Sequence, residues 1–148
     1  MNKPMQGKLC LVTGATDGIG KASARALLEA GATVIVHGRN PVKIRNVVEE
    51  LGVYGELHTV LADFAALDAV SQMTVELQQR FGRLDVLINN AGLLTDRRQL
   101  SQDGFELTFA VNYLAPYLLT NLLLGLLEVS SPMRIVNVAS SAMGGGAI

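Results

Sequence analysis

The sequence has little of what several classes of protein require. It contains a single cysteine, Cys10, which excludes a disulfide within the chain and fits a reducing compartment. Neither sign of charge is in excess, since 12 Lys and Arg stand against 13 Asp and Glu, a net charge of -1. Electrostatics therefore gives no reason to expect nucleic acid or an anionic membrane as a partner. The two histidines, His37 and His58, have no metal-ligand spacing, so we expect ordinary strand or surface residues there and no metal site.

Long apolar segments are also missing. Residues 1–7 lack the apolar stretch of a signal peptide. The most apolar region, 109–127, is interrupted by polar residues and by Pro116, whereas a membrane-spanning helix needs about 20 mostly apolar residues. We therefore expect no membrane span and a cytoplasmic protein, with 109–127 forming a helix of the core or of an interface; the alternative is that this region associates with a membrane.

The most informative stretch is a glycine-rich turn between an apolar run and a helical pattern. Residues 8–12 are typical of a buried strand, the turn Thr13-Gly14-Ala15-Thr16-Asp17-Gly18-Ile19-Gly20 follows, and apolar residues then recur with helical spacing to Ala30. Glycines allow a tight turn and a close approach of a ligand to the backbone. A helix start presents unpaired N–H groups to an anion. This order predicts a phosphate site; the alternative is a turn that only packs the helix on its strand.

Strand and helix patterns alternate along the whole chain, which has the length of one domain. Such alternation predicts an α/β fold, a Rossmann-type doubly wound parallel sheet of strand order 3-2-1-4-5 over residues 1–148. We expect strands at 8–12, 33–36, 56–61, 84–88 and 133–139, and helices at 19–30, 41–51, 67–81 and 104–130. Asn40 is expected to cap the second helix, with Pro41 at its first position.

Polar and glycine residues follow every expected strand: the glycine turn, Arg39, Asp63, the stretch 89–92 and Ser140. The carboxyl ends of parallel strands share one edge, where ligands of such sheets bind. At the end of the second strand there is no carboxylate for ribose hydroxyls, as an NAD enzyme would have, but Arg39. A guanidinium suits a 2′-phosphate, so we expect NADP, with NAD less favoured. The alternative for Arg39 is an exposed loop residue.

These motifs together resemble the short-chain dehydrogenase/reductase family, in its retinol-dehydrogenase-like branch. The matching stretches are Thr-Gly-x-x-x-Gly-Ile-Gly at 13–20, Asp63, Asn-Asn-Ala-Gly at 89–92, Asn112 in the long helix, and Ser140 in the Asn-Val-Ala-Ser pattern. The resemblance implies hydride transfer between a nicotinamide cofactor and a small-molecule alcohol/carbonyl substrate, whose identity stays open between retinoids, steroids, other lipophilic carbonyls and sugars.

The resemblance also implies roles for individual residues. The cofactor-binding residues would be Gly14, Thr16, Asp17, Gly18, Ile19, Gly20, Arg39, Asp63, Asn90, Ala91 and Gly92. The catalytic residues would be Ser140, which orients the substrate, and Asn112, which holds a proton-relay water.

Four of these residues have a second interpretation. Asp17 is favoured as the cap of the first helix, and Asp63 is either the carboxylate beside the adenine or a cap of the third helix. Asn112 is either functional or a satisfied core amide, and Ser141 is the alternative to Ser140.

The family's Tyr-x-x-x-Lys does not occur. The tyrosines are Tyr54, Tyr113 and Tyr117, and none has Lys four residues later. The chain is therefore expected to be the amino-terminal portion of such an enzyme, with a sheet incomplete at its carboxyl-terminal side, an open apolar edge on the fifth strand, and little activity alone.

The alternative function is a non-catalytic dinucleotide-binding module or fragment. A methyltransferase would usually need an acid after the second strand, and a P-loop would need Gly-Lys-Ser/Thr; both are missing. Relatives often pair through the long helix, so a homo-oligomer through 104–130 is expected.

Overall fold

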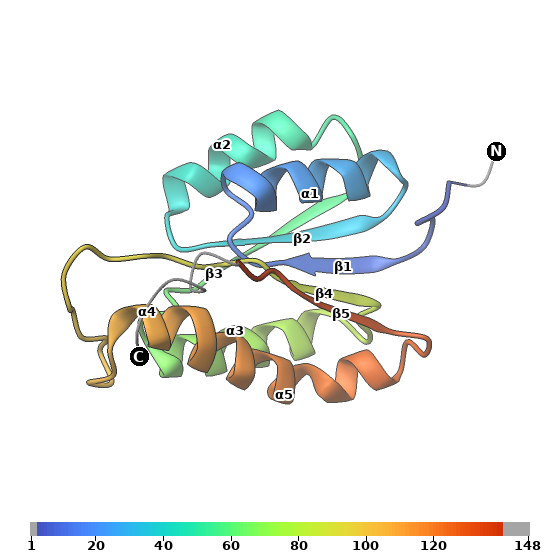
Figure 1. Cartoon of the computed structure of the whole chain (residues 1–148). Coiled ribbons are helices and arrows are strands. Elements are labelled where there is room, and N and C mark those ends of the chain that lie inside the picture. Colours follow the sequence, from blue (N-terminus) through green and yellow to red (C-terminus); the bar gives the residue numbers. More distant parts are fainter. Residues whose placement is uncertain (1–2, 141–148) are drawn as a thin grey trace.

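The sheet has five parallel strands in the order β3-β2-β1-β4-β5 (Figure 1). The computed structural model describes residues 3–140. The strands are β1 (Leu9–Val12), β2 (Thr33–Gly38), β3 (Leu57–Leu61), β4 (Val86–Asn89) and β5 (Arg134–Asn137). The predicted doubly wound order is confirmed. Strands β4 and β5 differ by one to two residues from the predicted ends, the usual scale of boundary differences.

The helices form one layer on each face of the sheet. They are α1 (Gly18–Glu29), α2 (Pro41–Leu51), α3 (Leu67–Arg80), α4 (Leu107–Phe109), the π-helical turn η1 (Ala110–Leu114) and α5 (Ala115–Glu128). Figure 1 shows α1 and α2 above the sheet and α3, α4 and α5 below it. Asn40 caps α2 as predicted, because its side chain accepts from the backbone N–H groups of Val42 and Lys43.

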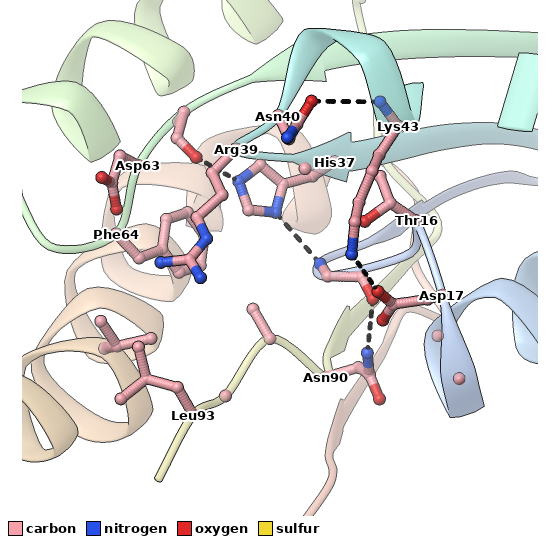
Figure 2. Close-up of a pocket in the computed structure, with 18 of the residues that line it drawn as sticks. Thr16, Asp17, His37, Arg39, Asn40, Lys43, Asp63, Phe64, Asn90 and Leu93 are labelled. Atoms are coloured by element: carbon pink, nitrogen blue, oxygen red, sulfur yellow. Dashed lines mark hydrogen bonds and ion pairs between the residues drawn. The ribbon is translucent and has the colours of Figure 1, made fainter. Parts of the chain in front are cut away.

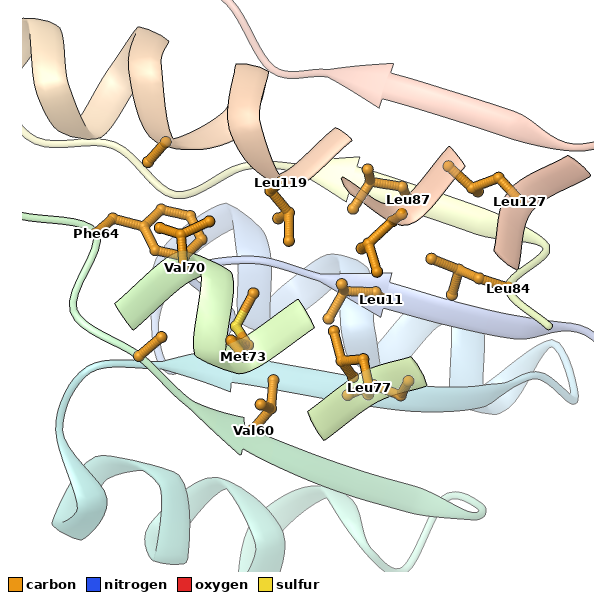
Figure 3. Packing of buried hydrophobic residues seen from close by; sticks show 14 of the residues in the cluster. Leu11, Val60, Phe64, Val70, Met73, Leu77, Leu84, Leu87, Leu119 and Leu127 are labelled. Atoms are coloured by element: carbon orange, nitrogen blue, oxygen red, sulfur yellow. The ribbon is translucent and has the colours of Figure 1, made fainter. Parts of the chain in front are cut away.

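Each layer buries its own apolar cluster, because alternate strand residues point to opposite faces. Cys10, Val12 and Val34 pack with α1 and α2. Leu11 and Leu87 pack with α3 and α5, where Leu119, Leu123 and Leu127 have no exposed surface (Figure 3). The near-continuous apolar runs of the central strands reflect burial on both faces.

The parallel register brings the carboxyl ends of the strands to one edge of the sheet. Val12 of β1 lies opposite Val36 of β2 and Ile88 of β4. The segments that follow these strands are therefore neighbours, although residues 13 and 90 are far apart in the sequence. The outer edge of β5, by contrast, pairs with no strand within residues 3–140, and Val136 and Val138 beside it are each 45% exposed.

At the amino ends of the strands, on the side of the sheet away from the cleft-forming segments, lies a buried carboxylate, Asp85, whose side chain is 1% exposed. It accepts from Lys8 Nζ at 3.1 Å, from the N–H of Leu9 at 2.9 Å and from Arg83. Burial raises the pKa of Asp85, but these hydrogen bonds outweigh it and hold the pKa below its ordinary value. Asp85 thus fastens the start of β1 to the start of β4.

The long carboxyl-terminal helix is the largest departure from the predicted elements. It was expected over 104–130 as one helix, but it begins at Leu107, contains the turn η1 and ends at Glu128. Glu106 caps its start by accepting from the N–H groups of Thr108 and Phe109 at 2.9 and 2.7 Å. Pro116 has no N–H and its ring clashes with the carbonyl four residues earlier, which accounts for the wide turn just before it.

Within the described residues, one helical segment is long and apolar enough to cross a membrane: Leu107–Glu128, with a mean hydropathy of 1.4. Length and composition alone give this result, and a core helix of a soluble protein meets the same criterion. Here the face formed by Ala115, Leu119, Leu123 and Leu127 is fully buried in the core.

Candidate functional site

A cleft opens at the carboxyl ends of β1, β2, β3 and β4 (Figure 2). Its volume is about 520 Å³, within the range of small-molecule sites. All eleven residues predicted to bind the cofactor line it: Gly14, Thr16, Asp17, Gly18, Ile19, Gly20, Arg39, Asp63, Asn90, Ala91 and Gly92. The topology therefore brings them together, and their individual roles stay predictions.

The glycines of the turn have different structural reasons to be glycine. Gly14 has φ +61°, and a Cβ there would lie 2.8 Å from Ala91 Cα. A Cβ on Gly20 would lie 2.3 Å from the carbonyl oxygen of Gly14 and 2.4 Å from Asn90 Nδ2. Gly18 has φ +53° but open space around it. Gly14 and Gly20 thus serve close packing, whereas Gly18 leaves the cleft side of the turn open to a ligand.

Hydrogen bonds join the glycine turn to the loop after β4. Thr13 Oγ1, buried in the sheet, accepts from the N–H groups of Asn90 and Ala91, both at 3.0 Å. In return, Asn90 Nδ2 donates to the carbonyls of Thr13 and Gly14 at 2.9 and 3.0 Å. Four bonds between residues 76 to 78 positions apart in the sequence hold these two segments as one unit, so Asn90 acts on the cleft by fixing its wall.

The start of α1 offers backbone donors to the cleft. The N–H groups of Gly18, Ile19 and Gly20 have no acceptor within residues 3–140, whereas the N–H of Lys21 donates to the carbonyl of Asp17. Unpaired amides at a helix start, together with the helix dipole, form an anion site. A diphosphate fits this position by charge and by the open space at Gly18.

His37 lies in β2, a strand position as expected from the sequence, but its side chain is buried and makes specific hydrogen bonds at the cleft. Its ring is buried, stacked 4.3 Å from the ring of Phe64. Nδ1 accepts from the N–H of Gly14 at 3.1 Å, and Nε2 lies 3.0 Å from the carbonyl oxygen of Ala62. Because Nδ1 is an acceptor, the neutral ring carries its proton on Nε2 and donates it to Ala62.

The prediction that Asp17 caps α1 is wrong in its chemistry. Asp17 occupies the capping position, but its side chain makes no capping hydrogen bond. It accepts from Lys43 Nζ at 2.7 Å instead, and both side chains are exposed at the cleft (Figure 2). Asn40 places Lys43 in the first turn of α2, within reach of the glycine turn. The competing cation explains why the carboxylate turns away from the helix start.

Arg39 follows β2 and its side chain extends beside Phe64 at the cleft (Figure 2). Within residues 3–140 its guanidinium has neither a hydrogen bond nor an ion pair. Asp63 lines the cleft two residues after β3 ends. Its side chain accepts from the N–H of Ala65 at 2.9 Å, so Asp63 does not cap α3. That cap comes from Asp103, which accepts from the N–H of Leu67 at 2.9 Å.

The two predicted catalytic residues lie outside the lining of the cleft. Asn112, in η1, donates to the carbonyl of Leu93 and accepts from its N–H, both at 2.8 Å. It is exposed, so the core-amide alternative is wrong. Ser140 is an exposed residue three positions after β5, and Ser141 lies outside the described residues, so the choice between them stays a prediction.

The sequence interpretation gave no cofactor role to several residues that line the cleft, among them His37, Phe64 and Lys43, nor to Thr13, which is buried. His37 and Phe64 had a signal, because His37 directly follows the apolar run 33–36 and Phe64 stands three residues after the end of β3. Lys43 had a weaker one, as a cation in the first turn of a helix, where the dipole disfavours it. Thr13 was within the quoted motif, but its pairing with the loop after β4 depends on sheet order.

The sheet order and a cleft at its topological reversal are those of a dinucleotide-binding Rossmann-type protein. The family model for short chain dehydrogenases matches residues 8–147, and the chain belongs to this family of oxidoreductases. Within the family it is retinol-dehydrogenase-like. It is 43% identical to retinol dehydrogenase 14 of Mus musculus, over 92% of this chain and 45% of that protein. It is 38% identical to retinol dehydrogenase 13 of Homo sapiens, over 92% of this chain and 42% of that protein.

The chain thus spans less than half the length of these two relatives. Solved structures share its fold. The Pseudomonas aeruginosa RhlG/NADP active-site complex aligns with a TM-score of 0.83 and 30% identity, over 99% of this chain and 61% of that one. A metagenomic short-chain oxidoreductase in complex with NADP aligns with a TM-score of 0.84 and 32% identity, over 97% and 66%.

The buried His37 predicts a loss of stability in mild acid. Burial lowers its pKa to about 4, against about 6.5 in an unfolded chain. Between these values the unfolded chain binds a proton that the folded chain does not, so stability is full above pH 6.5 and falls toward pH 4, by roughly 3 kcal/mol. Urea unfolding across this range measures the fall, which His37→Gln should flatten.

The matched control is His58→Gln on β3, which should keep the wild-type decline. Asp85 affects stability only at lower pH. Because its pKa is lowered in the folded chain, the stabilisation that it provides is lost only as the pH falls below its ordinary pKa of 3.8. An unchanged slope in the His37 variant would contradict the role of this buried ring.

Proposed function

We propose that the protein is the cofactor-binding portion of an NADP-dependent oxidoreductase that transfers a hydride between the nicotinamide and an alcohol/carbonyl substrate. The observation that carries the proposal is Arg39, a cation of the cleft without a partner in the described chain, placed after β2 where dinucleotide enzymes hold the adenosine ribose. Retinol dehydrogenases among the relatives and NADP complexes among the similar structures support it.

The cleft fits such a cofactor in three places. The amides of Gly18, Ile19 and Gly20 would hold the diphosphate. Arg39 would hold a 2′-phosphate through charged hydrogen bonds. Asp63 lies at the wall after β3, on the side that an adenine would occupy. NADP, when bound, would supply or accept the hydride; the chain's own residues bind and orient it.

On the substrate side, Ser140 would orient the reacting oxygen and Asn112 would order the loop that approaches it. Asn112 already fixes Leu93 through two hydrogen bonds, and a Cβ on Gly92 would lie 3.4 Å from Asn112 Oδ1. The wall of the cleft after β4 therefore has little freedom to move. No tyrosine of this sequence is followed by Lys four residues later, so the acid–base pair of the family is not supplied by this chain.

Arg39→Ala should lower the ratio of NADP to NAD affinity by roughly tenfold to a hundredfold, because a charged hydrogen bond contributes about 1.5–3 kcal/mol. Calorimetric titration of the 148-residue chain with NADPH and NADH measures the ratio. Arg45→Ala is the matched control, since Arg45 is an exposed cation of α2 outside the cleft. An unchanged ratio in the Arg39 variant would overturn the NADP assignment.

The isolated chain should bind NADPH yet turn over slowly, because loss of a general acid/base alone costs about 10²–10⁴ in rate. Steady-state assays with a panel of primary and secondary alcohols, and with retinol, test this. Turnover at a rate typical of the family would contradict it. The alternative, a non-catalytic dinucleotide-binding module, also predicts binding without turnover. Adding a second polypeptide that carries the family's Tyr-x-x-x-Lys distinguishes these two functions, because only the enzyme portion would gain activity.

We also propose that two copies pair through α4, η1 and α5. Phe109, Tyr113 and Tyr117 are about half exposed or more and stack along one face, with ring centroids 5.1 and 6.4 Å apart. No charged residue lies between Leu107 and Leu127. Sedimentation analysis should show a dimer that Tyr117→Glu dissociates and Val48→Glu, on exposed α2, does not. A monomeric wild-type chain would contradict the pairing.

A further inference from the structure

The His37 side chain joins two walls of the cleft. Its ring bonds the N–H of Gly14, in the glycine turn after β1, and the carbonyl of Ala62, directly after β3. Figure 2 shows the ring between these two segments, with a dashed line to each. Its side chain comes from β2, the strand between them. One ring thus spans the carboxyl ends of three adjacent strands.

Backbone bonds beside the ring follow the same path. The N–H of Ala15 donates to the carbonyl of His37 at 2.9 Å, and the N–H of Ala62 donates to the carbonyl of Gly38 at 3.1 Å. These bonds fix both walls to β2 through the main chain, and Asn90 holds the other side of the glycine turn. The ring adds a further attachment on the β2 side, at the N–H of Gly14.

We propose that His37 is a positioning residue for the dinucleotide, a neutral strut that sets the distance between the glycine turn and the wall formed by Ala62, Asp63 and Phe64. This inference rests on the proposed function. In a dinucleotide the ribose joins the adenine to the diphosphate, which limits their separation, and the ligand must meet both walls at once. If the distance between the two walls varied, the adenine or the diphosphate could still bind its own wall, but the two groups of one dinucleotide could not bind both walls together.

The ring also decides which amides remain for the ligand. It takes the N–H of Gly14, which the glycine motif alone would assign to a phosphate. The N–H groups of Gly18, Ile19 and Gly20 have no acceptor within residues 3–140. The diphosphate is thereby directed toward the start of α1 and away from the β1 end of the turn.

The strut requires a neutral ring, since only neutral imidazole can accept from Gly14 while donating to Ala62. The charged groups around it are Asp63 after β3, Arg39 after β2, and the Asp17–Lys43 pair across the cleft. Burial lowers the pKa of His37 to about 4, against the opposing effects of the Ala62 hydrogen bond and the Asp63 charge. The ring is therefore neutral throughout the physiological range and works as a constant support.

Binding of two ligands of different reach tests the proposal. His37→Phe keeps a ring against Phe64 but loses both hydrogen bonds, and His37→Gln retains a donor and an acceptor. NADPH spans both walls, whereas adenosine 2′-monophosphate reaches only the β2 and β3 side. His37→Phe should weaken NADPH about tenfold, the scale of an unsatisfied buried donor, and leave adenosine 2′-monophosphate within about twofold; His37→Gln should recover most of the loss.

Three outcomes would overturn the strut. NADPH binding by folded His37→Phe could equal the wild type, or both ligands could weaken equally, as general destabilisation would cause. Nitrogen NMR of the wild-type ring could also show the proton on Nδ1. Thermal unfolding verifies that each variant is folded, and His58→Gln is the histidine control. If the wild-type chain itself binds no NADPH, the proposed function fails; if it binds and only the His37 comparison fails, the strut alone is rejected.

Discussion

The cleft depends on one interlocking contact, between the glycine turn after β1 and the loop after β4. Four hydrogen bonds join Thr13 and Gly14 to Asn90 and Ala91 there, and both Gly14 and Gly20 approach the loop too closely for a Cβ. The contact exists only because β1 and β4 are neighbours in the sheet. If it opened, the start of α1 would lose its fixed position, and the three unpaired amides of its first turn would no longer be held at the cleft.

Two further attachments make that contact into a binding site. His37 fastens the other side of the glycine turn to the end of β3, and Asn112 fastens the loop after β4 to η1. The polar side chains of the cleft are thus divided into two groups. His37, Asn90 and Asn112 bond to backbone and hold the walls, while Arg39 and the exposed Asp17–Lys43 pair carry the charge that a phosphorylated ligand would meet.

The distinction explains why motif residues and ligand contacts are different sets. Gly14 belongs to the glycine motif, yet its N–H is used by His37 and its missing Cβ makes room for Ala91. A Cβ on Gly18 would meet nothing within 4 Å, and Gly18 lines the cleft. The side-chain amide of Asn90 donates to the carbonyl groups of Thr13 and Gly14 in the turn. Some residues of the motif are therefore needed to build the walls of the cleft, and others to leave room for a ligand.

The sequence by itself determined the alternation of strands and helices, the sheet order and the edge at which polar residues gather, because hydrophobic period, caps and glycine turns are local signals. It also determined that all eleven proposed cofactor residues would share one cleft. Only the tertiary structure decided the burial of His37, the pairing of Asp17 with Lys43 and the cap that Asp103 gives α3. Each of these depends on a partner 23 to 36 residues away, and the distance between such partners is set by how strands and helices pack, which local spacing does not encode.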